Sequence, residues 1–173
     1  ENSVKSDLHV LRGLHFQNEP FAQSKLVSVQ VGKILDVAVD IRKDSETYGK
    51  YFSYILSSEM HESVFIPKGF AHGYLTLSRT AVVNYLVDNY YNKLEEDGIS
   101  FEDEFLNINW GIKTSKIICS KKDKYLPISS LLKSKQTTNY EIVNTVPFHK
   151  VVKEHETIDL CKIDIVITYP LLL

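Results

Sequence analysis

The chain has 173 residues, of which 43% are hydrophobic and 24% are charged, and its formal net charge at pH 7 is −2. This length and composition are typical of one globular domain, and a charge so close to zero gives no field that would attract nucleic acid or anionic lipid. The sequence therefore predicts neither nucleic-acid nor membrane binding and favours a small molecule or a protein as partner.

Cysteine usage and the short apolar runs indicate a cytoplasmic protein. The two cysteines, Cys119 and Cys161, form no CxxC motif, and the sequence opens without a signal-like apolar stretch. Two isolated cysteines are typical of a reducing compartment rather than of a disulfide framework. The longest apolar runs, such as ITYPLLL, are too short to span a bilayer. We expect no structural zinc, because the spacing that such sites need is absent.

Strand patterns dominate the first half of the chain. Apolar and polar residues alternate twice between residues 25 and 41, and Gly32 and Lys33 separate the two runs, which predicts a hairpin. Further strands are expected over 50–56, 64–67, 71–77 and 81–87, where β-branched and aromatic residues are enriched. Short strands with turn residues between them favour an all-β sandwich or barrel, and of these architectures we expect a jelly roll.

The composition changes after about residue 133. SKQTTNYE is polar, and TIDLCKIDIVITYPLLL is strongly β-forming. Helical periodicity is weak, so we expect only short helices toward the C-terminus, at DEFLNINW (103–110) and LPISSLLKSK (126–135). We divide the chain into a jelly-roll domain over 1–133 and a tail over 134–173. The tail's β-forming segment needs a partner strand, from the same domain or another subunit, because an exposed edge invites aggregation.

Two histidines are candidates for chemistry. His15 lies in the apolar run VLRGLHFQ, where an imidazole is either a general base or a core residue hydrogen-bonded to the backbone. His72 lies between small residues in GFAHGY, which allow a ligand or another backbone to approach closely. The alternative is that Gly73 marks a bulge and His72 faces solvent or an internal carboxylate. No HxH pair occurs. A metal would need carboxylates such as Asp36 or Asp40 beside the two histidines, and we expect no metal.

Lysine and tyrosine residues on the predicted strands are ordinary by themselves. A lysine in a cleft, such as Lys25, can neutralise an oxyanion, and a well-placed phenol, such as Tyr85, can deliver a proton. The alternatives are a solvated lysine and one of ten tyrosines on a sheet surface. Tyr90 and Tyr91 offer aromatic faces that stack on a base or cap the core.

Four segments, taken together, carry a resemblance to a known family: NSVKSDLHVLRGLHFQ, AQSKLVSVQVGKILDVAVDIRKDSETYGKY, IPKGFAHGYLTLS and INW. From Asn2 to about Pro127 the chain resembles the dTDP-4-dehydrorhamnose 3,5-epimerases, cupin-like jelly-roll enzymes of deoxysugar-nucleotide biosynthesis. The resemblance implies inversion of carbons 3 and 5 of a nucleotide-linked 4-keto-6-deoxyhexose, without a cofactor or a metal. It also implies a homodimer.

The resemblance implies a role for each candidate. His15 matches the base, Lys25 the residue that stabilises the enolate oxygen, and Tyr85 the acid on the opposite face. Asp123, in CSKKDKYLP, matches the aspartate that orients the base, after a one-residue insertion beyond Trp110. Positions that match contacts to the sugar, the diphosphate or the nucleotide are Asn2, Arg12, His72 and Tyr90.

The chain departs from the family pattern at both ends. The family's opening strands, with a D-x-R-G motif that helps bind the nucleotide, have no counterpart before Glu1, and Gly111 replaces a family proline. IDIVITYPLLL is similar to the family's first strand, so it either takes that strand's place in a permuted or swapped sheet or belongs to a rearranged copy with weak or no activity. Three other functions stay open: a catalytically silent sugar-nucleotide binder, a 3-epimerase that acts at one carbon, and a purely structural dimer module.

Overall fold

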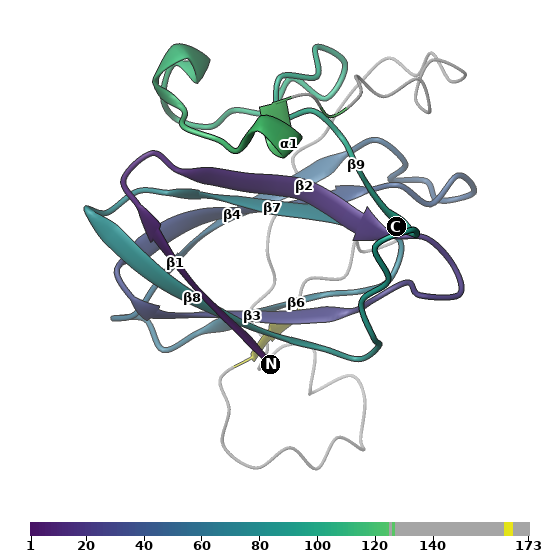
Figure 1. Ribbon diagram of the computed structural model, residues 1–173, viewed down its shortest axis with the longest axis horizontal. Coiled ribbons are helices and arrows are strands. Elements are labelled where there is room, and N and C mark those ends of the chain that lie inside the picture. The colour runs from purple at the N-terminus through teal and green to yellow at the C-terminus, as the bar shows by residue number, and fades with distance from the viewer. Residues whose placement is uncertain (125, 127–164, 168–173) are drawn as a thin grey trace.

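The computed structural model describes residues 1–124 and 126, together with the backbone of residues 165–167, and its main elements are strands in two facing sheets (Figure 1). The first sheet has the order β1-β8-β3-β6-β10 and the second the order β5-β4-β7-β2-β9. The first five strands are β1 (Asn2–Asp7), β2 (Leu11–Gln17), β3 (Lys25–Val31), β4 (Lys33–Asp40) and β5 (Tyr51–Ser57). They are followed by β6 (Ser63–Ile66), β7 (Phe70–Thr76), β8 (Thr80–Val87), β9 (Glu96–Gly98) and β10 (Ile165–Ile167).

The connectivity of the first eight strands is that of a jelly roll. Each of these strands passes to the opposite sheet, except that β4 and β5 are neighbours in the same one. All pairings among β1 to β9 are antiparallel. The all-β jelly roll expected from the sequence is confirmed.

The predicted hairpin over residues 25–41 is wrong. β3 pairs with β6 and β8, whereas β4 pairs with β5 and β7 in the other sheet. Gly32, with φ of +80°, carries the chain between the sheets, and a side chain there would collide with the Thr80 carbonyl oxygen. Alternation shows that each strand has a buried face, but it does not show which strand is the partner.

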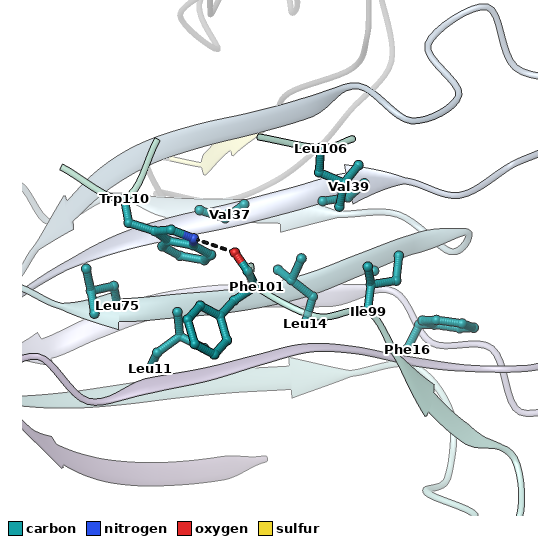
Figure 2. Packing of buried hydrophobic residues seen from close by; sticks show 11 residues of the cluster. Leu11, Leu14, Phe16, Val37, Val39, Leu75, Ile99, Phe101, Leu106 and Trp110 are labelled. Atoms are coloured by element: carbon teal, nitrogen blue, oxygen red, sulfur yellow. Dashed lines mark hydrogen bonds between the residues drawn. The ribbon is translucent and has the colours of Figure 1, made fainter. Parts of the chain in front are cut away.

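Apolar residues pack on both faces of the β5-β4-β7-β2-β9 sheet. Between the two sheets lies a cluster that includes Val27 and Val83 from one sheet and Ile34 and Leu56 from the other. On the outer face, residues 99–119 cover a second cluster, shown in Figure 2, in which the Trp110 indole N–H donates to the Phe101 carbonyl at 3.0 Å. This outer layer explains why β4 and β7 are buried on both sides.

The segment DEFLNINW forms turns, so the helix predicted over 103–110 is wrong. The Asp103 carboxylate accepts hydrogen bonds from the backbone N–H groups of Phe105 and Leu106, and Asn107 has φ of +43°. The helical segments among the described residues are a 3₁₀ turn (Thr114–Lys116) and α1 (Lys121–Lys124), which do lie toward the C-terminal side of the jelly roll. Apart from residue 126, LPISSLLKSK lies outside the described residues.

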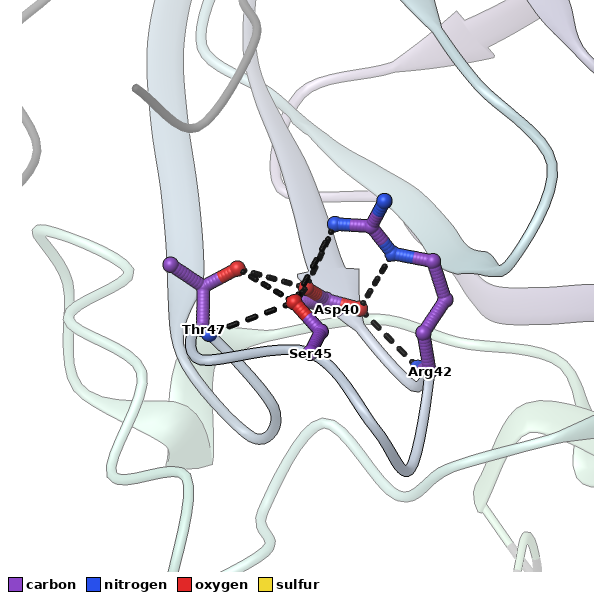
Figure 3. Close-up of polar contacts among 4 residues, drawn as sticks. All are labelled: Asp40, Arg42, Ser45 and Thr47. Carbon is purple, nitrogen blue, oxygen red and sulfur yellow. Dashed lines mark hydrogen bonds and ion pairs between the residues drawn. The ribbon is translucent and has the colours of Figure 1, made fainter. Parts of the chain in front are cut away.

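A buried carboxylate organises the loop after β4 (Figure 3). Asp40 is 1% exposed and accepts hydrogen bonds from the Arg42 guanidinium at 2.9 and 2.8 Å and from the hydroxyls of Ser45 and Thr47, each at 2.6 Å. Burial raises the pKa of Asp40, but these hydrogen bonds outweigh it and hold the pKa below its usual value. The Arg42 guanidinium also lies over the Phe70 ring at 4.8 Å. Asp40 therefore has a structural explanation that involves no metal.

Three residues of the C-terminal segment, β10, pair in parallel with β6. The rest of the segment and Cys161 lie outside the described residues, so the division into a domain and a tail stays a prediction. Cys119 is a free thiol. In the described part of the chain, no helix has the length and apolarity that crossing a membrane requires.

Candidate active site

A cavity of about 840 Å³ opens between the two sheets, and strands of both sheets contribute to its wall together with α1 and the segment after β8. All eight site residues expected from the sequence line it: Asn2, Arg12, His15, Lys25, His72, Tyr85, Tyr90 and Asp123. Their roles stay predictions, but their convergence on one cavity is an observation.

A bulge in β2 brings two of these residues to the same face. Arg12 pairs with Tyr74 and His15 with His72, so two residues of β2 lie opposite the single Gly73 of β7. Strict alternation would point positions 12 and 15 to opposite faces, and the extra residue restores them to one face. The backbones approach closely here, since a Cβ on Gly73 would lie 2.6 Å from the Arg12 carbonyl oxygen.

His15 and Asp123 form the most direct contact in the cavity. The Nε2 atom of His15 lies 2.7 Å from Oδ1 of Asp123, although the two residues are 108 positions apart in the sequence. Burial raises the pKa of Asp123, but the hydrogen bond and charge of His15, with smaller contributions from Ser120 and Lys122, outweigh it and keep the pKa below its usual value. Asp123 is therefore a carboxylate at neutral pH, and the ring nitrogen that faces it donates the proton.

His72 faces an internal carboxylate, which was one of the alternatives that the sequence left open, although the sequence did not identify the residue. Its Nε2 atom lies 2.8 Å from Oδ1 of Asp36, and both side chains are buried. The sequence suggested Asp36 only as a hypothetical metal ligand. The feature of the sequence that could have identified Asp36 is an acidic residue at a position of β4 that faces inward. Alternation alone does not show whether that face of the strand meets solvent or a cavity.

Lys25 reaches the cavity from the start of β3, in the sheet opposite His15. Burial lowers the pKa of its ammonium group from 10.5 to about 8, although the negative charges of Asp36 and Glu96 act in the opposite direction. Lys25 is therefore a cation at pH 7 whose proton is less tightly held than that of a surface lysine.

A second tyrosine accompanies Tyr85. Tyr74 shares a hydrogen bond of 3.2 Å with the Ser6 hydroxyl, which also accepts the Arg12 Nε proton at 3.0 Å. Burial raises the pKa of both phenols, while the positive charge of Arg12 opposes that rise, so both remain protonated at neutral pH. Nothing in the sequence singled out Tyr74 or Ser6.

Asn2 and Tyr90 lie at the start of β1 and after the end of β8. Asn2 pairs with Tyr85 across the β1 and β8 ladder, so it accompanies that phenol into the cavity wall. Tyr90 is 87% exposed, and this leaves its ring face open to a ligand or to solvent.

An acidic residue of β9 was also missed. Glu96 is paired with Lys122 of α1, and its Oε2 accepts the Tyr91 hydroxyl proton at 2.6 Å. Its backbone is opposite that of Gln17 in the β2 and β9 ladder. No pattern in the surrounding NKLEEDGIS distinguishes this glutamate from Glu95 beside it.

Within the described residues, no group of three or more histidine, cysteine or acidic side chains is arranged to hold a metal ion. Each of the two cavity histidines is hydrogen-bonded to a carboxylate. The pairs are typical of acid and base chemistry, in which a carboxylate fixes the orientation of an imidazole.

Known proteins share this sequence and this fold. The sequence model of dTDP-4-dehydrorhamnose 3,5-epimerase matches residues 1–130. The chain belongs to the dTDP-4-dehydrorhamnose 3,5-epimerase family. It is 47% identical to the Shigella flexneri enzyme over 123 residues, which are 71% of this chain and 67% of that protein. The chain thus spans about two thirds of the length of this relative.

Solved structures of the family superimpose on the chain. The Bacillus anthracis epimerase with TDP and PPi bound has a TM-score of 0.70 and 42% identity, over 74% of this chain and 73% of that one. The Legionella pneumophila enzyme in complex with dTDP-4-keto-L-rhamnose has a TM-score of 0.69 and 38% identity, over 81% and 73% of the two chains. The cupin-like jelly-roll fold of these epimerases is therefore the fold of this chain.

Proposed function

We propose that the chain is an epimerase that inverts carbons 3 and 5 of a nucleotide-linked 4-keto-6-deoxyhexose, in the biosynthesis of deoxysugars of the dTDP-rhamnose type. The observation that carries the proposal is the position of His15 and Tyr85 on opposite sheets of one cavity, with Lys25 beside them. Inversion of a carbon requires a base on one face of the sugar and an acid on the other. Membership of the epimerase family supports this assignment.

The proposed reaction begins at His15. Its Nε2–H group is bonded to Asp123, which leaves Nδ1 to accept the proton from carbon 3 or carbon 5. The electron pair of the broken C–H bond forms an enolate whose negative charge lies on the carbon 4 oxygen. The Lys25 ammonium stabilises that oxygen, and the Tyr85 hydroxyl returns a proton to the opposite face of the carbon. No electrons leave the substrate, so the reaction needs no redox cofactor.

Four further residues are proposed to bind the substrate. Arg12 has a planar guanidinium that suits the diphosphate, and Ser6 holds its Nε–H so that the other N–H groups remain available. His72 and Asn2 are assigned to the sugar and diphosphate, and Tyr90 to the nucleotide base, on which an exposed aromatic ring can stack. The ligands in the names of the Legionella and Bacillus structures support a nucleotide-sugar substrate.

A cytoplasmic homodimer is the proposed state of the protein. Among the described strands, β1 and β5 each end a sheet with an unpaired edge, and a second copy that covers one of them would remove an exposed template for aggregation. Sedimentation of the purified protein measures this directly, and a monomer at micromolar concentration would contradict it.

Proton NMR of dTDP-4-keto-6-deoxyglucose with the protein in deuterated water tests the function. We expect the signals of the hydrogens on carbons 3 and 5 to disappear and the couplings between the ring hydrogens to change. Loss at carbon 3 alone would replace the proposal with a 3-epimerase. Line broadening without any exchange would identify a catalytically silent binder instead.

A further inference from the structure

α1 brings two neighbouring charged residues to the cavity wall. Asp123 is bonded to His15 of β2, and Lys122 forms an ion pair with Glu96 of β9. Glu96 lies directly opposite Gln17 in the ladder that joins β9 to β2. Directly opposed side chains share a face, and Gln17 follows His15 by two positions in β2, so both contacts of α1 reach the side of the sheet that lines the cavity.

The chain is held at the start of β2 by backbone hydrogen bonds of Ile118 with His9 and Leu11, but α1 itself, which begins three residues later, has little internal structure to fix its position. It has four residues, which is far below the length at which a helix is stable in isolation. A local bond from the Asp123 backbone N–H to the Ser120 hydroxyl, at 3.1 Å, shapes the turn but does not attach it to the sheet. The position of Asp123 relative to His15 therefore depends on contacts between α1 and the sheet.

The carboxylate of Glu96 is well placed to supply such a contact. Its side chain is 15% exposed, and the Tyr91 hydroxyl occupies its other oxygen, so its own position is fixed. Burial raises the pKa of Glu96, but Lys122, Tyr91 and the charge of His15 outweigh it and hold the pKa below its usual value. Glu96 is therefore charged at every pH at which an imidazole can act as a base.

We propose that Glu96 and Lys122 are positioning residues, whose ion pair holds α1 on the sheet and thereby keeps Asp123 in contact with His15. The inference rests on the proposed function, in which that contact orients the base. It adds two residues of the cavity wall whose proposed effect on the reaction is exerted through Asp123. Lys122 is 53% exposed, and half-exposed ion pairs contribute little to global stability, so removing this one leaves the fold intact.

Three variants of α1 test the role in catalysis. Lys122→Met is expected to lower kcat for hydrogen exchange about tenfold with little change in KM, because misplacement of a catalytic group affects the transition state most. Lys122→Arg, which keeps the ion pair, is expected to restore the rate. Lys121→Met removes the same charge from the same turn without touching Glu96 and is the matched control. Unchanged kcat in Lys122→Met, or an equal loss in Lys121→Met, would overturn the proposal.

Glu96→Gln separates positioning from charge. This variant removes the ion pair and also a negative charge that raises the pKa of Lys25, so its activity is expected to decline at lower pH on the alkaline side than that of Lys122→Met. Identical pH profiles for the two variants would contradict an effect of the Glu96 charge on Lys25.

The His15 ring supplies a readout that does not depend on turnover. In protein labelled with ¹⁵N at histidine, the ring signals of His15, assigned with His15→Asn, report the bond to Asp123. They are expected to shift or broaden in Lys122→Met and to stay unchanged in Lys121→Met. If the ring signals respond in this way in the two variants but the wild type catalyses no hydrogen exchange, the proposed function fails and the positioning role stands. Ring signals insensitive to Lys122→Met in an active enzyme would refute the positioning role alone.

Discussion

His15 and His72 are cross-strand partners on β2 and β7, and each ring is bonded through Nε2 to a different carboxylate. The two pairs differ in exposure. The His15 side chain is 26% exposed, whereas that of His72 is 7% exposed and its partner Asp36 only 1%. A base must exchange protons with its ligand and afterwards with solvent. This difference supports His15 as the base and a fixed binding role for His72.

Replacement of His15 by alanine is expected to abolish exchange at both carbons, with a loss of about a thousandfold or more, because one base serves both. Asp123→Asn keeps the shape of the aspartate side chain, but the amide no longer favours the reactive tautomer of His15. A loss of about a hundredfold or more in the exchange rate is therefore expected. Proton NMR in deuterated water measures both rates. His61→Asn is the control, since His61 is exposed with φ of +52°, a conformation that asparagine tolerates. Full activity in His15→Ala would refute the central assignment.

Replacement of Tyr85 by phenylalanine is expected to reduce inversion at carbon 5 about a hundredfold while deuterium still enters at carbon 3. The reason is that His15 and Lys25, which form the enolate, remain in place. Comparison of the two carbon signals over time gives the ratio directly. Tyr54→Phe removes a phenol that is bonded to Glu62 outside the cavity and should leave both rates unchanged. Equal losses at both carbons would contradict a preference of Tyr85 for carbon 5 and would show that the phenol serves both carbons alike.

The lowered pKa of Lys25 predicts a pH dependence of activity. The ammonium loses its proton as the pH rises through about 8, and the enolate then loses its cationic partner, so kcat is expected to fall above that pH. Lys25→Arg keeps the charge throughout this range because arginine is not deprotonated. We therefore expect a lower but flat rate between pH 7 and 9 in that variant. An alkaline decline at the same pH in Lys25→Arg would assign the titration to another group.

The same residue predicts an opposite trend in stability. Below about pH 8 Lys25 is charged in both the folded and the unfolded chain, and the folded state carries the full cost of burying the charge. Between about 8 and 10.5 the unfolded chain binds more protons, so the stability of the wild type rises with pH. Lys25→Met should therefore be more stable than the wild type at pH 7, by a margin that shrinks at pH 9.5. Urea unfolding at the two pH values measures the margin, and a constant one would contradict the burial of the charge.

Gly73→Ala is expected to destabilise the fold by about 2–4 kcal/mol, because the new Cβ would lie 2.6 Å from the Arg12 carbonyl oxygen at the bulge in β2. Since the bulge brings Arg12 and His15 to one face, activity should fall further than stability alone explains. Gly111→Ala is a useful comparison, since Gly111 has φ of +72° but nothing within 4 Å of an added Cβ. It should cost only about 1–2 kcal/mol and no activity. Thermal unfolding and the exchange assay together distinguish these outcomes.

Local sequence pattern predicted the strands but not their partners. The alternation through Val27 and Val29, and again through Val37 and Val39, marks β3 and β4 correctly. The two strands nevertheless lie in opposite sheets, because Gly32 at a corner is indistinguishable in sequence from Gly32 in a hairpin. Pairing is decided by contacts between distant residues, which periodicity does not record.

The site was predictable only where residues matched a family motif. His15, Lys25 and Tyr85 were weak candidates by residue type and became specific through the resemblance, and the structure brings them to one cavity. Asp36 and Glu96 were missed as site residues because the sequence does not distinguish a buried carboxylate from an exposed one. Burial is known only when the segments that cover both faces of the strand are known. Their partners come from β7 and α1, far along the chain.

The 108-residue separation of His15 from Asp123 also concerns how the protein becomes active during synthesis. β2 leaves the ribosome well before α1, and in the proposed mechanism its histidine gains the carboxylate that orients it only when α1 has been translated and lies against the sheet. A nascent chain in which β1 to β9 have already paired would still lack the contact between Asp123 and His15. The appearance of activity is thus expected to report the docking of α1 beside the cavity rather than the pairing of the strands.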